Sequence, residues 1–272
     1  MAINTAQRAQ TRAGDIPKTK RQNVPVTRRD AWWIEPVLTV VAFIAFSLYA
    51  LWRALEARYI NTYALGSHYL SPFYSPPIQE WVHITLPISP ALFVLLFPLS
   101  FRASCYFCRR SYYRAFFWDP PACAVPESVR RPHYTGERTF PFVLQNLHRY
   151  VLYAIFIWVV FHWIHLYQAC VFTGAAGTHF GIGLGTLVLL FDTLMLTAYV
   201  VSCHSFRHLA GGVVNRFSRS GASQARFRLW KGVSALNARH GLFFWLSLLS
   251  VGLADFYVRM VASGVLHDLR LL

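Results

Sequence analysis

IGLGTLVLLFDTLMLTAYVVSCHSF, residues 182–206, decides the fold, because it is apolar over a length that can cross a lipid bilayer. A membrane-spanning helix needs about 20 mainly apolar residues. Four further stretches of this kind occur at 36–57, 84–107, 146–171 and 241–264. We therefore predict an all-α membrane protein, a bundle of five transmembrane helices over residues 34–272. A basic cytoplasmic N-terminal tail over residues 1–33 precedes the bundle.

The positive charges alternate along the chain. The net charge is +15, and Lys and Arg gather in segments 8–29, 102–138 and 207–239, whereas the connections 59–83 and 172–181 contain neither. Because basic loops stay on the cytoplasmic side, this pattern predicts a cytoplasmic N-terminus and a C-terminus outside the cell membrane. The basic excess is then a topology signal, and we expect no nucleic-acid partner. The polar first thirty residues also lack the apolar core of a cleavable signal peptide.

Thiols and imidazoles from distant parts of the chain fall on the predicted cytoplasmic side. The second and fourth spans both run inward and end in Cys and His residues, the third span begins there, and one Cys lies in the loop between the second and third. These residues are Cys105, Cys108, Cys123, His148, Cys203, His204 and His208. Cys170 falls near the outer end of the third span and is excluded. The sequence thus predicts a metal or redox site at this membrane level.

A mixture of thiols and imidazoles is typical of a Rieske-type [2Fe–2S] cluster, in which two Cys bind one iron and two His bind the other. We assign Cys105 and Cys123 to one iron. His204 and His208, four residues apart on one helix face, are assigned to the other. The further candidate ligands are Cys108, Cys203 and His148. Structural zinc also takes two Cys and two His, so the ligand count leaves zinc open.

Haem b is the competing cofactor, since helical membrane anchors can hold it between histidines of different helices. The candidates are His83, His162 and His165 on the outer side and His148, His204 and His240 on the inner side. The first span contains no histidine and the inner side is rich in thiols, which makes haem the weaker expectation.

The segment RRSYYRAFFW, residues 109–118, interleaves cations with aromatic side chains. A quinone headgroup needs hydrogen-bond donors beside a flat apolar slot, and these residue types supply both. Our candidates for binding a quinone are Arg114, Trp118, His148 and Arg207. The same composition also suits an interfacial belt that docks a partner.

Three ionisable residues fall inside predicted spans, where such groups are costly and face the bundle interior. Asp255 and Arg259 are four residues apart and can pair on one helix face. Asp192 has no partner nearby in the sequence, which leaves open a role in proton uptake or in holding a neighbouring helix.

Longer motifs carry a resemblance. They are SCYFCRRSYYRAFFWDPPACAV at 104–125, YTGERTFP at 134–141, QNLHRY at 145–150 and CHSFRH at 203–208. In these motifs, and over most of 34–265, the chain resembles the membrane anchor of actinobacterial succinate dehydrogenase.

The resemblance implies a cytochrome-b-like subunit of respiratory complex II with no catalytic activity on its own. Such a subunit docks the iron–sulfur subunit, and a flavoprotein subunit oxidises succinate; a further small membrane subunit is compatible with it. Electrons pass to menaquinone or ubiquinone, and some mycobacterial-type members hold a Rieske-like cluster in place of haem. Two other classes stay open from the sequence: a zinc-stabilised membrane scaffold, and a transporter with Asp192 and Asp255 on an ion path.

Overall fold

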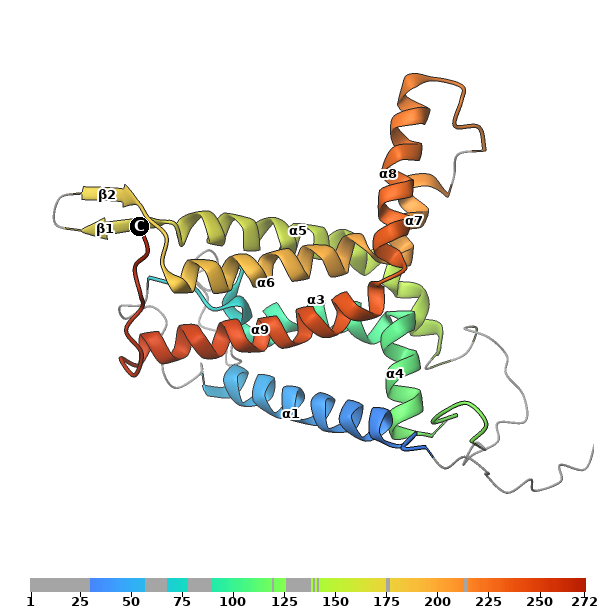
Figure 1. Ribbon diagram of the computed structural model, residues 1–272, viewed down its shortest axis with the longest axis horizontal. Helices are drawn as coiled ribbons and strands as arrows, with labels where there is room; N and C mark the ends of the chain where they lie inside the picture. Colours follow the sequence, from blue (N-terminus) through green and yellow to red (C-terminus); the bar gives the residue numbers. More distant parts are fainter. Residues whose placement is uncertain are drawn as a thin grey trace, which may run out of the picture.

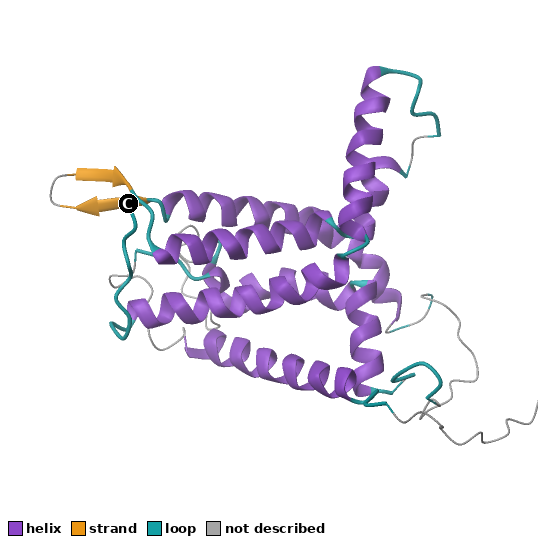
Figure 2. Cartoon of the chain, viewed as in Figure 1, coloured by secondary structure: helices purple, strands orange, loops and turns teal. Residues whose placement is uncertain are grey.

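The computed structural model describes residues 30–56, 68–77, 90–118, 120–125, 138, 140, 142–174, 177–212 and 215–272. Five long helices run side by side along the molecule (Figure 1). They are α1 (Ile34–Glu56), α3 (Pro90–Ser104), α5 (His148–Gln168), α6 (Leu184–Val201) and α9 (His240–Ala262). Helices dominate the described chain (Figure 2), so the prediction of an all-α membrane fold is confirmed.

The long helices suit a bilayer because they turn leucines outward. Leu38 and Leu48 of α1 and Leu253 of α9 are each more than half exposed. Such exposure would be costly in water, whereas hydrocarbon solvates it. By length and composition, α1, α5, α6 and α9 can each cross a membrane.

The second predicted span is broken. α3 ends at Ser104, and α4 (Tyr106–Phe116) continues after a bend of 77°. Cys105 lies at the bend with an extended backbone conformation. The described residues therefore contain four whole spans and one bent pair that counts as a fifth only if it is taken as one span.

A pair of helices and a β-hairpin were not predicted. The segment expected to be a loop after the fourth span folds into α7 (His204–Gly211) and α8 (Gly221–Asn237), and α8 runs across the direction of the spans (Figure 1). At the opposite end, β1 (Val171–Gly174) and β2 (Gly177–Phe180) form an antiparallel hairpin. Short 3₁₀ turns η2 (Pro72–Tyr74) and η3 (Phe142–Leu147) precede α3 and α5.

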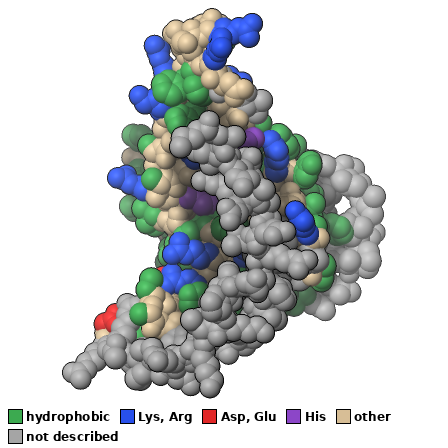
Figure 3. All heavy atoms as spheres, turned by 90° about the vertical axis from the view of Figure 1, so that its right-hand side faces the viewer, with side chains coloured by type: hydrophobic (Ala, Val, Ile, Leu, Met, Phe, Trp, Pro, Cys, Tyr) green, Lys and Arg blue, Asp and Glu red, His purple; other side chains and the backbone are tan. Residues whose placement is uncertain are grey.

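The two ends of the bundle differ in charge. Lys and Arg side chains spread over the end formed by α4, α7 and α8 (Figure 3). The described chain starts at this end, and the C-terminus lies at the other, beside the hairpin (Figure 1). This arrangement fits the predicted topology, in which the basic end is cytoplasmic; the orientation itself stays a prediction, as does the tail boundary, because residues 1–29 lie outside the described chain.

Candidate functional site

A group of two thiols and two imidazoles lies where the broken span meets the other helices. The Cys105 thiol lies 3.4 Å from Nε2 of His240, and the Cys203 thiol lies 3.0 Å from Nε2 of His148. Both cysteines are buried, at 2% exposure each. The four residues come from the start or end of different helices, so residues far apart in sequence meet at one end of the bundle.

Each imidazole is fixed at its second nitrogen by a serine. Ser104 Oγ lies 3.0 Å from Nδ1 of His148, and Ser202 Oγ lies 2.8 Å from Nδ1 of His240. Each serine directly precedes one of the two cysteines, but it holds the histidine that faces the other cysteine. This crossing ties the ends of α3 and α6 to both histidines.

Aromatic rings hold the imidazoles from the side. His148 stacks on Phe101 with ring centroids 4.4 Å apart, and His240 stacks on Tyr199 at 5.0 Å. The guanidinium of Arg102 lies 4.6 Å from the centre of the Tyr199 ring. The planes of both imidazoles are therefore set by packing as well as by hydrogen bonds.

The arrangement repeats a short motif that the sequence analysis missed. Residues 101–105 read FRASC and residues 199–203 read YVVSC. In both copies the aromatic ring stacks on a histidine, the serine holds the same histidine, and the cysteine begins the next helix as its N-cap. An aromatic-x-x-Ser-Cys repeat at the ends of two spans was the signal that could have paired Cys203 with Cys105.

Burial controls the chemistry of the free thiols. Loss of hydration raises the pKa of Cys203 to about 11, so without a bound metal the thiol stays protonated. A metal that binds there has to displace this proton, because the thiolate is the ligand.

The other proposed metal ligands lie elsewhere. Cys123 is exposed beside the start of α1, and His204 and His208 are exposed on α7. Nδ1 of His208 lies 3.4 Å from the guanidinium of Arg149. Cys108 is buried in the same apolar cluster as Cys105. Within the described chain, no three His, Cys, Asp or Glu side chains are placed to hold a single metal ion.

The histidines considered for haem also have defined neighbours. His162 Nδ1 lies 2.9 Å from the carbonyl oxygen of Trp158, and His165 Nδ1 lies 2.6 Å from Ser75 Oγ. His83 lies outside the described residues. At the basic end of the bundle, His148 and His240 direct Nε2 at thiols, so sulfur and nitrogen atoms lie together there.

The quinone candidates divide between three places. Arg114 and Trp118 lie near the start of α1, where Arg114 is 3.8 Å from Glu35 and Trp118 packs edge-on against Trp32. Arg207 donates to Ser234 and lies over the ring of Trp230, within the α7–α8 pair. The remaining candidate, His148, belongs to the thiol and imidazole group described above.

A groove of about 670 Å³ lies beside Arg114. It is lined by the first turns of α1, by Arg114 of α4 and by Trp245 of α9. A smaller hollow of about 170 Å³ shares Glu35, Thr39, Arg114 and Trp245 and adds Phe107. The Phe107 ring centroid is 6.3 Å from that of His240, so one aromatic side chain separates this hollow from the histidine.

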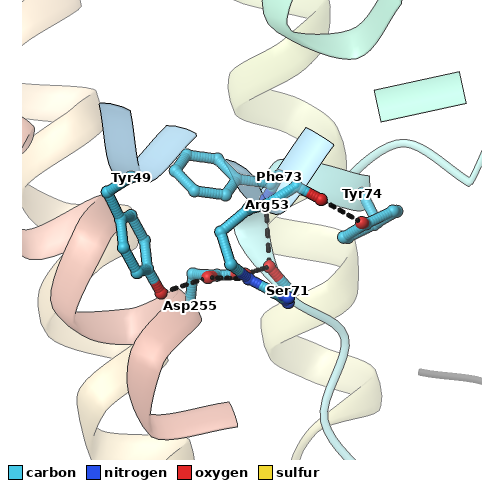
Figure 4. A network of polar contacts seen from close by, with 6 residues as sticks. All are labelled: Tyr49, Arg53, Ser71, Phe73, Tyr74 and Asp255. Atoms are coloured by element: carbon cyan, nitrogen blue, oxygen red, sulfur yellow. Dashed lines mark hydrogen bonds and ion pairs between the residues drawn. The ribbon is translucent and has the colours of Figure 1, made fainter. Parts of the chain in front are cut away.

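The charged residues within the spans hold the helices together. Asp255 accepts hydrogen bonds from Arg53, Tyr49 and Ser71, which joins α9 to α1 and to the segment before η2 (Figure 4). Arg259, expected to pair with Asp255, has its guanidinium 4.0 Å from the Trp52 ring centre. Asp192 accepts a hydrogen bond from Ser250 at 2.6 Å and so links α6 to α9.

Comparison with known proteins agrees with this architecture. Residues 34–264 match the family model of the actinobacterial succinate dehydrogenase subunit SdhC. A chain in the solved structure of the Mycobacterium smegmatis Sdh1 complex in the apo form is 38% identical, with a TM-score of 0.80, and the match covers 93% of this chain and 97% of that chain. No curated protein matches the chain.

These matches confirm the resemblance seen in the sequence and set aside the transporter reading. The apolar helices and the family together make this a multi-pass integral membrane protein. The chain belongs to the actinobacterial succinate dehydrogenase SdhC family and is the membrane subunit of such a complex.

Proposed function

We propose that this subunit passes electrons from the iron–sulfur subunit to a quinone through a Rieske-like [2Fe–2S] cluster held by Cys105, Cys203, His148 and His240. The observation that carries the proposal is the crossed pairing of two buried thiols with two imidazoles. The flavoprotein subunit oxidises succinate in this scheme, and the anchor supplies only docking and the last electron-transfer step.

The donor set fits this group. A Rieske cluster needs two thiolates on one iron and two imidazoles on the other, so each iron takes only two protein ligands. No three such side chains surround a single point in the described chain, which argues against a site for one metal ion. It does not argue against a two-iron cluster. When bound, such a cluster accepts and releases one electron at a time, and its imidazole ligands raise its potential.

The ligand set proposed here keeps Cys105 from the sequence assignment and replaces the other three. Cys203 takes the place of Cys123, because it is buried with Cys105 whereas Cys123 is exposed. His148 and His240 take the places of His204 and His208, because they direct Nε2 at the thiols.

The surrounding residues have distinct tasks. Ser104 and Ser202 hold Nδ1 of the two histidines, which leaves Nε2 of each as the coordinating atom. Arg102 donates to Ser247 and to the Phe244 carbonyl, which fixes its positive charge beside Tyr199. A fixed positive charge favours the added electron electrostatically.

The quinone binds, in this proposal, in the groove between α1 and α4. Arg114 and Thr39 offer hydrogen-bond donors there, and Trp245 offers a flat apolar wall. The aromatic side chain Phe107 lines the smaller hollow and packs near His240, so the path from the centre to the quinone is short. The groove opens at the basic end, where protons for the quinol are available from water.

The test is electron paramagnetic resonance of the dithionite-reduced, purified complex, together with its iron and acid-labile sulfide content. We expect a rhombic signal beyond those of the iron–sulfur subunit, and we expect Cys105→Ala and Cys203→Ala to remove it. Sharp reduced α-bands in the visible spectrum would instead indicate haem, and zinc without additional iron would indicate a scaffold site.

The matched control is Cys123→Ala, a thiol removed from an exposed position. It should leave the additional signal intact. Subunit stoichiometry and succinate-dependent reduction of a soluble dye report whether each variant still assembles. Retention of the signal in an assembled Cys203→Ala complex, or its loss in Cys123→Ala, would refute the proposed ligand set.

A further inference from the structure

α7 and α8 form a small helical pair with a core of its own. Phe217, Phe227 and Trp230 stack together with ring centroids between 4.9 and 6.3 Å apart. Trp230 packs so closely on Gly211 that a Cβ there would lie 2.5 Å from the indole ring. Arg226 donates to the carbonyls of Leu209 and Ala210, where α7 ends. The two helices therefore pack against each other as one folded unit.

One exposed stripe of α8 has no covering in the described chain. Its members recur every three or four residues, which places them on one side of the helix. They are Ala222, Ala225, Leu229 and Gly232, and the half-buried Leu236 continues the row. Leu229 is 51% exposed. The cation Arg228 is exposed next to the stripe, and Lys231 is exposed further round the same helix.

The charge of this region has a single sign. No Asp or Glu occurs between Asp192 and Asp255, whereas Arg216, Arg219, Arg228 and Lys231 are all exposed. α8 crosses the direction of the spans at the basic end of the bundle, so a membrane around the spans would lie parallel to it (Figure 1). A helix in that plane that exposes an apolar stripe and cations outside the stripe has the arrangement of an interfacial membrane helix.

We infer that the α7–α8 pair is an interfacial element that binds anionic phospholipid headgroups through Arg228 and Lys231, with Leu229 at the boundary of the acyl chains. A soluble acidic partner would satisfy the cations alone. The apolar stripe beside them favours a lipid surface, which presents both anionic headgroups and hydrocarbon. This role is independent of the metal centre and of quinone binding.

The test uses the whole complex purified in detergent and its thermal unfolding midpoint during titration with phosphatidylglycerol. Each basic side chain near an anionic surface is worth about fivefold in affinity, so Arg228→Gln with Lys231→Gln should raise the half-effective lipid concentration ~30-fold. Phosphatidylcholine should have little effect in either protein. High salt should weaken the phosphatidylglycerol effect in the parent complex.

The matched control is Lys18→Gln with Lys20→Gln, which removes the same charge from the N-terminal tail and should leave the titration unchanged. Leu229→Asp should weaken the lipid response without removing a cation. The inference is overturned if the Arg228 and Lys231 variant titrates like the parent. It is also overturned if that variant sheds the iron–sulfur subunit while the lipid response persists, because the surface would then dock a protein.

Discussion

His148 and His240 are held by the same device, although they begin different helices. Each ring stacks on an aromatic side chain that lies three residues before a serine, and that serine meets Nδ1. The cysteine that follows the serine faces the other histidine. Neither FRASC nor YVVSC can therefore shift without moving both imidazoles. The repeat makes the group a single unit across α3, α5, α6 and α9.

The two serines are predicted to control occupancy of the centre. Ser104→Ala and Ser202→Ala each free one Nδ1, so the ring loses the partner that sets its tautomer and direction. Loss of such an outer partner typically costs 10- to 100-fold in metal affinity. We expect each variant to bind less iron and to give a weaker additional resonance signal per complex.

Ser100→Ala is the control for the serine variants. It lies one turn before Ser104 on α3, and its hydroxyl donates to the Leu96 carbonyl of the same helix. Iron content and signal in this variant should equal those of the parent. If Ser104→Ala and Ser202→Ala match the parent as well, the serines have no role in holding the centre.

Tyr199→Phe should lower the potential of the centre. The Tyr199 hydroxyl is buried and lies near the Cys105 thiol. We expect it to donate a hydrogen bond to the Cys105 sulfur when the centre is occupied. Hydrogen bonds to the ligand sulfurs tune such clusters. A bond of about 1 kcal/mol corresponds to about 40 mV for one electron.

A redox titration followed by paramagnetic resonance checks this value. Phenylalanine keeps the ring that stacks on His240, so cluster content should stay at the parental level while the midpoint potential falls. An unchanged midpoint at full occupancy would show that the hydroxyl does not bond to a ligand sulfur.

Hydropathy was sufficient to locate the unbroken spans. The predicted spans 36–57 and 241–264 correspond to α1 and α9 within about two residues, because a long apolar run has few other structures open to it in a bilayer. The break at Cys105 could not be read this way. Cys105 is flanked by Ser104 and Tyr106, and no Pro or Gly nearby in the sequence marks the end of a helix there.

The ligand set was harder to predict than the fold. His204 and His208 were chosen because their spacing places them on one helix face, but that face of α7 is exposed. Which face of a short helix turns inward depends on its neighbours, here Trp230 of α8 against Gly211. The membrane level was predicted from the sequence, whereas the rotation of each helix at that level was not.

Asp255 is predicted to be the most sensitive charged residue for stability. Asp255→Ala would leave the buried Arg53 guanidinium, which lies 2.7 Å from the carboxylate, without this counter-ion. Breaking one side of a buried ion pair costs about 3–5 kcal/mol. We expect a clear fall in the thermal unfolding midpoint of the detergent-purified complex.

The double replacement Arg53→Met with Asp255→Leu separates charge from packing. It removes both charges together, so it should destabilise less than Asp255→Ala alone. Tyr49→Phe, which removes one hydrogen bond to the carboxylate, should cost about 1 kcal/mol. A double variant that is no more stable than Asp255→Ala would mean that Arg53 and Asp255 stabilise the fold by their packing and not by the attraction between their charges.

Asp268 is predicted to make the C-terminal end of the bundle sensitive to acid. Burial disfavours its charged form, but hydrogen bonds from Tyr69, Tyr257 and the Gly185 amide outweigh this and lower the pKa of the carboxyl below its ordinary value. A lowered pKa in the folded state means that the ionised carboxylate stabilises the fold above about pH 4. This contribution is lost as the pH falls through the lowered pKa.

The measurement is the unfolding midpoint of the parent complex and of Asp268→Asn between pH 7 and pH 3. The parent should be more stable at neutral pH, and the difference should shrink as the carboxylate takes up a proton. Glu35→Gln is the control, since that carboxylate is 77% exposed at the opposite end and lies 3.8 Å from Arg114. A difference in unfolding midpoint between the parent and Asp268→Asn that is constant over the whole pH range would contradict this. It would show that the hydrogen bonds to Asp268 stabilise the fold whatever the charge of its carboxyl group.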